Sequence, residues 1–147
     1  MNSVSFVNEH LFTRDVDEYA ASRIKGAGGR SAFLGYRKYP CHVCLSVNEQ
    51  VVHGLAGDRR LDFGDIVSID MGIVYKKLFL DAARTVGIGE ISTEAKILLH
   101  ITREALLRGI EAAKVGNTTG HIGAAIEAFI KEKSNHKGKY GIVRELV

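Results

Sequence analysis

The sequence predicts a single α+β domain in which an antiparallel sheet packs against helices. The chain has 147 residues, of which 46% are hydrophobic and 25% charged, a size and composition typical of one globular domain. Two β-branched runs flank a dilysine turn within residues 66–86, a pattern typical of a β-hairpin. Apolar residues recur at helical spacing in residues 13–24 and again after residue 92. We therefore expect one domain over residues 1–147.

The N-terminal part predicts one helix followed by short strands. The helix covers residues 13–24, with Thr13 as its N-cap and an apolar residue at every fourth position. The glycine-rich residues 25–30 are expected to end it as a C-cap and linker. A phosphate-binding loop is the alternative, but these residues lack its Lys-Ser/Thr ending and follow a helix instead of a strand. Residues 31–54 are rich in aromatic and β-branched residues, which predicts short strands and a turn.

Cys41 and Cys44 are the two cysteines of the chain. A redox pair of this spacing normally opens a helix, whereas the sequence around Cys44 looks extended, which would turn the two side chains to opposite faces. Two thiols also fall short of a four-cysteine zinc site, although His42 or His53 could be recruited as further ligands. We expect reduced thiols that are packed or half-exposed, with redox or metal use as the alternative.

Residues 66–86 are the best-defined part of the prediction. We expect strands at residues 66–75 and 79–86, joined by a turn at residues 75–78. In the first strand Asp70 lies on the face opposite to an apolar row, because side chains alternate between faces. That row comprises Val67, Ile69, Met71 and Ile73.

Two aspartates of this hairpin are expected on the same face. If the turn is centred between Lys76 and Lys77, Asp81 faces Gly72 and lies diagonal to Asp70. Diagonal neighbours have Cβ atoms about 7 to 8 Å apart, which suits two carboxylates reaching toward shared cations.

The alternative for the two aspartates is a solvated sheet face. However, aspartate is disfavoured in strand interiors, and this face also carries Gly72 and Val74. Two nearby carboxylates on a half-buried face repel each other unless a cation, a proton or an arginine offsets the charge. Arg84 is one candidate partner, and divalent metal is the other.

Two more helices and a strand are expected downstream. The first helix begins at residue 92 or 93 and ends at Gly116, and the second begins at residue 118 or 119. A basic loop at residues 131–139 then precedes a strand at residues 140–147. The apolar stripes of the helices are expected in the core: Ile97, Leu98, Ile101, Ala105 and Ile110 in the first, and Ile122, Ala125, Ile126, Phe129 and Ile130 in the second.

Composition and charge argue against nucleic-acid and membrane partners. The formal net charge is +3, but Lys and Arg are spread along the chain and only 7% of residues are aromatic, so a basic stripe with interleaved aromatic residues is missing. No apolar stretch is long enough to span a bilayer, and the N-terminus lacks the pattern of a signal peptide. We therefore expect a cytoplasmic protein with no membrane and no direct nucleic-acid partner.

Several ordered stretches carry motifs that belong together. Residues 33–55 contain Gly-Tyr, a turn ending in Pro, then Ser-Val-Asn-Glu and His-Gly. Residues 62–92 contain Gly-Asp-Ile-Val, Ile-Asp, Asp-Ala-Ala-Arg-Thr and Val-Gly, and residues 116–130 and 141–146 match later segments. This succession resembles the type I methionine aminopeptidases, metalloenzymes of the pita-bread fold. The resemblance covers the chain from about Asp15 to Val147 and implies the N-terminal half of that fold.

The resemblance implies roles for six residues. Asp70 and Asp81 fall on two of the family's metal-ligating carboxylates. His53 falls on the histidine that hydrogen-bonds the substrate near the metals, which implies both a catalytic and a substrate-binding role. The family's methionine pocket corresponds to Tyr36, Tyr39 and Cys44.

The resemblance also implies a cofactor and a substrate. The complete family site holds two divalent ions, from among Co, Mn, Fe and Zn, that activate a water for attack on the first peptide carbonyl and stabilise the developing charge. The substrates are N-terminal methionine peptides of nascent proteins.

Parts of the family pattern are missing. The remaining family ligands, a histidine and two glutamates, begin with a Gly-His-Gly motif after the strand that residues 141–146 resemble, and this chain ends at Val147. The family's opening helix is also not matched. We therefore expect a member truncated at both ends, with weak metal binding and little or no peptidase activity by itself. Half of such a sheet would expose an unpaired edge and an apolar face, which predicts self-association.

Two other functions stay open at the level of sequence. One is a related pita-bread hydrolase of the proline-dipeptidase or creatinase kind, although the motifs around Tyr36 and His53 favour the methionine branch. The other is an inactive scaffold remnant, which would be indifferent to divalent metal and to the substitution Asp70→Asn.

Overall fold

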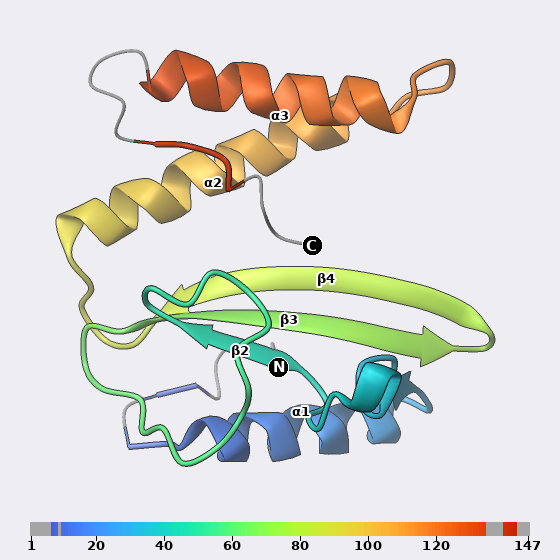
Figure 1. Ribbon diagram of the computed structural model, residues 1–147, viewed down its shortest axis with the longest axis vertical. Helices are drawn as coiled ribbons and strands as arrows, with labels where there is room; N and C mark the ends of the chain where they lie inside the picture. The colour runs from blue at the N-terminus through green and yellow to red at the C-terminus, as the bar shows by residue number, and fades with distance from the viewer. Residues whose placement is uncertain (1–6, 9, 135–139, 144–147) are drawn as a thin grey trace. The chain divides into compact units, whose positions relative to one another are not determined.

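The computed structural model describes residues 7, 8, 10–134 and 140–143. The chain divides into two compact units, residues 1–92 and 93–147, and each is described by itself. The single domain predicted over residues 1–147 stays a prediction. The elements of the first unit are α1 (Thr13–Gly26), β1 (Arg30–Ser31), the 3-10 turn η2 (Tyr36–Lys38), β2 (Cys44–Val47), β3 (Ile66–Tyr75) and β4 (Leu78–Gly87), and those of the second are α2 (Thr93–Ala112) and α3 (Thr119–Ser134) (Figure 1).

Strand β3 is the centre of an antiparallel sheet in the first unit. Strand β4 pairs with one edge of β3 over ten residues, and β2 and β1 pair with the other edge (Figure 1). Lys76 and Lys77 join β3 to β4, with φ of 47° and 70°, as a two-residue turn of type I′ requires. Tyr75 pairs with Leu78, so the predicted register centred between the two lysines is confirmed.

The core of the first unit lies on one face of the sheet. Helix α1 covers this face with Val16 and Ala20, and β3 contributes Val67 and Ile69. Met71 packs against this cluster, so the predicted apolar row of β3 is confirmed for Val67, Ile69 and Met71. The other buried members of the cluster are Val43, Leu45, Val47, Leu61 and Ile88.

The start of α1 differs from the prediction. The N-cap position is Phe12, and the Asp15 carboxylate accepts its backbone N–H at 2.8 Å. Thr13 is the first helical residue and is 1% exposed. Its hydroxyl donates to the Gly57 carbonyl at 3.0 Å and accepts the Gly57 N–H at 2.9 Å, so a distant loop claims the hydroxyl that was expected to cap the helix.

Helix α1 also fixes the chain that leads into β2. The Asp17 carboxylate accepts the backbone N–H groups of His42 and Val43 at 2.8 and 2.9 Å. Cys41 and Cys44, on either side of these residues, are both buried and free, which confirms the expectation of packed, reduced thiols.

The second unit is a pair of packed helices. Ile101 and Ala105 of α2 and Phe129 of α3 form its buried cluster, against which Ile126, Ile130 and Tyr140 pack. The other predicted core residues of α2 are more open, with Ile97, Leu98 and Ile110 at 40%, 43% and 58% exposure, because one neighbouring helix covers only a narrow stripe.

The last described residues and the helices differ in how well they match the predicted elements. Residues 140–143 form no strand, so the prediction of a strand there is wrong, and residues 144–147 lie outside the described residues. No helix within the described ranges combines the length and apolarity needed to cross a bilayer.

Candidate metal centre

Polar side chains of three neighbouring strands share the sheet face opposite to the core of the first unit. Directly paired residues of antiparallel strands project to the same face. Asp70 pairs with Cys44 of β2 on one side and with Ala83 of β4 on the other, and Gly72 pairs with Asp81. The two aspartates therefore lie diagonally on one face, as the register predicted.

Asp70 is a carboxylate without sufficient partners. Its Oδ1 atom is buried and has no hydrogen-bond partner within the described part of the chain. Burial raises the pKa of Asp70 above its usual value, and the Asp81 carboxylate raises it further, while His53 acts in the opposite direction. A buried charged oxygen without a partner is costly, so the site favours a proton or a cation at this position.

Arg84 does not supply that positive charge. It pairs with Ile69, and Ile69 belongs to the core of the first unit, so Arg84 projects from the face opposite to Asp70. Without Arg84, a proton or a divalent metal ion is left as the partner of the aspartates.

His53 lies in the loop that follows β2. Its side chain is exposed, and its backbone has φ of 58°, in the left-handed region that non-glycine residues seldom adopt. His53 lowers the pKa of Asp70, the direction expected of a nearby imidazole.

Cys44 pairs directly with Asp70, and Tyr39 is bonded to the loop that carries His53. The Tyr39 hydroxyl donates to the Gly54 carbonyl at 3.0 Å and also contacts the Val43 carbonyl at 3.4 Å. Burial raises the pKa values of both groups, and the Asp70 and Asp81 carboxylates raise that of Cys44 further, so both groups stay protonated. The Tyr39 hydroxyl is thus bonded within the protein, which leaves the aromatic ring as the part of Tyr39 that can contact a ligand.

Phe33 and Tyr39 form an aromatic wall, of which Tyr39 was predicted through the family resemblance and Phe33 was not predicted. A Cβ atom at Gly72 would lie 2.4 Å from a ring carbon of Phe33, so this ring occupies the space above the glycine, next to Asp81. The rings of Phe33 and Tyr39 meet edge to face, with centroids 6.4 Å apart. A glycine inside a strand signals a close approach of this kind, and Gly72 could have indicated it.

Tyr36 is joined to one other candidate residue, because the Tyr39 backbone N–H donates to the Tyr36 carbonyl at 2.9 Å. It lies on η2, is 64% exposed and packs with the Arg37 guanidinium, whose carbon lies 5.6 Å from the centroid of its ring. Within the described residues, Tyr36 makes no hydrogen bond with Asp70, Asp81 or His53. The Tyr36 side chain is therefore linked to the aspartates by no contact among the described residues, and its backbone is bonded to that of Tyr39.

The donor set fits part of a divalent metal site. Two carboxylates on one face, one with an unpartnered oxygen, are ligands that hard divalent ions prefer. However, the described ranges contain no cluster of three or more His, Cys, Asp and Glu side chains that could hold a metal ion. The described residues thus supply two donors and no complete coordination sphere.

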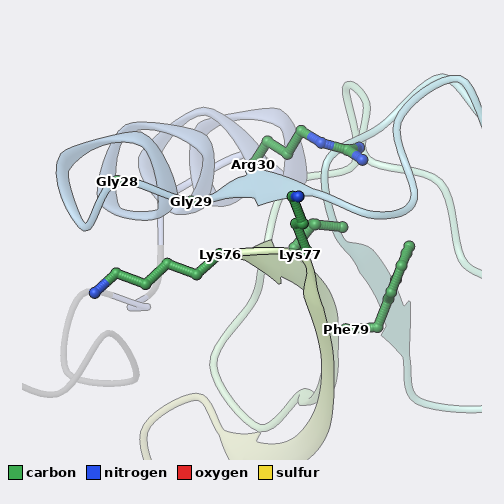
Figure 2. A pocket seen from close by; sticks show the side chains of 7 residues that line it. Gly28, Gly29, Arg30, Lys76, Lys77 and Phe79 are labelled. Atoms are coloured by element: carbon green, nitrogen blue, oxygen red, sulfur yellow. The ribbon is translucent and has the colours of Figure 1, made fainter.

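A separate hollow of about 570 Å³ lies at the turn end of the hairpin, lined by Gly28, Gly29, Arg30, Val74, Lys76, Lys77 and Phe79 (Figure 2). Neither Asp70 nor Asp81 lines this hollow, so it is not the aspartate site. The Lys76 and Arg30 side chains extend in opposite directions in Figure 2 and form no converging anion site.

Most of the chain matches a known protein family. The family model of metallopeptidase family M24 matches residues 2–146. The methionine aminopeptidase of Clostridium acetobutylicum is 38% identical over 136 residues, which cover 92% of this chain and 52% of that protein.

Solved structures agree with this match. Methionine aminopeptidase from Rickettsia prowazekii has a TM-score of 0.88 at 28% identity, over 97% of this chain and 57% of that one. The Xaa-Pro dipeptidase from Bacillus anthracis has a TM-score of 0.75 at 24% identity, over 89% and 36%, and shows likeness of fold alone.

The comparisons also bear on fold class and length. The chain spans about half the length of the curated relatives it matches. The prediction of an α+β fold corresponding to about half of a pita-bread fold is confirmed, since the antiparallel sheet and helices match about half of each structural neighbour.

Proposed function

The chain belongs to metallopeptidase family M24, and from this membership we propose that it carries the aspartate pair and the histidine of a methionine aminopeptidase site. The predicted resemblance to methionine aminopeptidases agrees with relatives of that name at 37 to 38% identity. The observation that carries the proposal is the buried Oδ1 of Asp70, which lacks a partner on a face shared with Asp81.

Each polar residue of the face has a distinct role in this proposal. Asp70 and Asp81 bind divalent metal, and His53 donates a hydrogen bond to the substrate beside it. When bound, divalent metal lowers the pKa of a water molecule and stabilises negative charge that develops on a carbonyl oxygen. Two ions, from among Co, Mn, Fe and Zn, are the number and identity that the family resemblance favours.

The aromatic wall of Phe33 and Tyr39 supports a preference for methionine. A thioether side chain packs favourably against aromatic rings, and it needs no polar partner. The Cys44 thiol, buried beside Tyr39, adds a soft, weakly polar surface. Tyr36 belongs to the proposed pocket only through the family resemblance.

The substrate can be tested with a chimera. In it, residues 2–146 replace the matched segment of the Clostridium acetobutylicum enzyme, so that the rest of that protein supplies any further donors. We expect chelator-sensitive release of methionine from a Met-Ala-Ser peptide. The same chimera with Asp70→Asn should be folded but inactive.

Two results would contradict the proposal. One is a folded chimera that leaves Met-Ala-Ser intact with Mn²⁺ present. The other is a chimera that cleaves Xaa-Pro peptides in preference, which would favour the proline-dipeptidase alternative that the Bacillus anthracis fold likeness keeps open. The chain by itself should release little methionine, because its described residues supply two donors.

Partners and location follow from the same proposal. Nascent proteins that begin with methionine are the proposed substrates, and the cytoplasm is the proposed location. Within the described residues β4 pairs along one edge only, which supports the predicted self-association.

A further inference from the structure

Gly54, the residue after His53, is held by three hydrogen bonds. Its carbonyl accepts the Leu45 N–H at 2.9 Å and the Tyr39 hydroxyl at 3.0 Å. Its own N–H donates to the Ser46 hydroxyl at 3.1 Å, in a buried contact. The backbone N–H and the carbonyl of Gly54 are therefore both bound to β2 or to the segment before it.

The space around Gly54 is also too small for a side chain. A Cβ atom there would lie 2.1 Å from the Leu45 carbonyl oxygen, so the loop backbone lies directly against β2. Glycine is required at this position because of this close approach.

The hydrogen bonds matter because His53 has an unfavourable backbone conformation. A non-glycine residue at φ of 58° is seldom stable unless its surroundings hold it. Leu45 and Tyr39 hold the carbonyl side of Gly54, whereas Ser46 alone holds its N–H, the group closest to His53.

We propose that Ser46 is a positioning residue, which fixes the backbone of His53 against β2 by accepting the Gly54 N–H. Ser46 is 3% exposed and projects from the same face as Asp70, two residues along β2 from Cys44. Its hydroxyl is too deeply buried to contact a peptide substrate directly. It acts on the site through the loop backbone.

Ser68 provides a matched control. It pairs directly with Ser46 across β2 and β3, and its hydroxyl is hydrogen bonded to that of Thr85 at 2.7 Å. Ser68→Ala therefore removes a similar hydroxyl from the same row of the sheet without touching Gly54. A general loss of stability would appear in both variants, and a loss of His53 position only in Ser46→Ala.

The test is NMR on the metal-free chain, with hydrogen exchange measured at the Gly54 amide and order measured at His53. Ser46→Ala should speed exchange at Gly54 about tenfold, which corresponds to about 1.4 kcal/mol. It should also lower the backbone order parameter of His53 and shift its imidazole resonances. Ser68→Ala should leave all three readouts as in the wild type.

Unchanged Gly54 exchange and unchanged His53 order in Ser46→Ala would overturn the proposal, as would equal changes in both variants. If Ser46→Ala does not fold, Ser46→Cys keeps the volume and replaces the hydroxyl by a weak acceptor, and the same changes are expected. Slow exchange at Gly54 in folded Ser46→Cys would also overturn it.

The consequence for catalysis rests on the proposed function, whereas the placement of His53 does not. In the methionine-releasing chimera, Ser46→Ala should lower kcat/KM about tenfold, because His53 is displaced from the substrate. Altered Gly54 exchange in an inactive chimera would mean that the proposed function fails while the positioning role stands.

Discussion

Replacing Asp81 by asparagine should stabilise the metal-free chain. Asp81 and Asp70 lie diagonally on one sheet face, and the Asp81 carboxylate raises the pKa of Asp70. Asp81→Asn removes this repulsion while keeping the shape of the side chain. The pKa of Asp70 should therefore fall, although burial continues to hold it above the usual value.

The size of the effect follows from the register. For charges about 7 Å apart, repulsion amounts to about 0.6 kcal/mol at the dielectric constant of water and about 2.4 kcal/mol at an effective constant of about 20. Asp81 is exposed, so solvent screening places the expected gain near the lower value, at about 1 kcal/mol.

The assay is urea unfolding with EDTA present, at a pH where both carboxyl groups are ionised. Asp62→Asn is the matched control, because Asp62 is an exposed aspartate of the same unit and the charge change is identical. The free energy of unfolding should rise in Asp81→Asn and stay unchanged in Asp62→Asn. Equal shifts in both variants, or an unchanged pKa of Asp70 in ¹³C NMR of the carboxyl carbon, would refute the reasoning.

Three further predictions concern stability. Gly72→Ala forces a methyl group into the aromatic wall and should cost about 1 to 3 kcal/mol in urea unfolding, whereas Gly57→Ala, with open space around it, should cost less than half as much. Replacing Lys76-Lys77 by Asn-Gly, residues suited to positive φ, should raise the melting temperature, and an unchanged temperature would contradict the strain at this turn. Because the folded chain holds the Asp70 proton to higher pH than the unfolded chain does, the free energy of unfolding without metal should fall as pH rises from about 3.9 through the raised pKa, by at most about 1.4 kcal/mol per pH unit. Asp70→Asn should flatten this slope, which a urea series across pH would measure.

Much of the fold could be predicted from local sequence patterns. Alternation along β3, together with a turn assumed to be centred between Lys76 and Lys77, predicted the pairing of Gly72 with Asp81. The helices followed in the same way from apolar spacing and glycine stops. Side-chain contacts between distant segments could not be predicted like this, as Thr13 shows, because its hydroxyl binds Gly57 instead of capping its own helix.

In the candidate site, too, local patterns predicted some positions, and contacts between distant segments determined the others. The register placed the two aspartates together, whereas the position of His53 depends on a loop that doubles back against β2 through Gly54. Phe33 approaches Gly72 from a segment about 40 residues earlier. A glycine inside a strand signals that some group lies close to it, but it does not say which residue. Only the family resemblance linked His53, Tyr39 and Cys44 to the aspartates before the structure did.

The central claim is that Asp70 and Asp81 bind divalent metal, and Mn²⁺ titration followed by electron paramagnetic resonance tests it most directly. The wild-type chain should deplete the signal of free Mn²⁺ in a saturable manner, and Asp62→Asn should behave like the wild type. Asp70→Asn should leave the Mn²⁺ free at the same concentrations. Equal depletion by the wild type and Asp70→Asn, or no depletion by either, would contradict the claim.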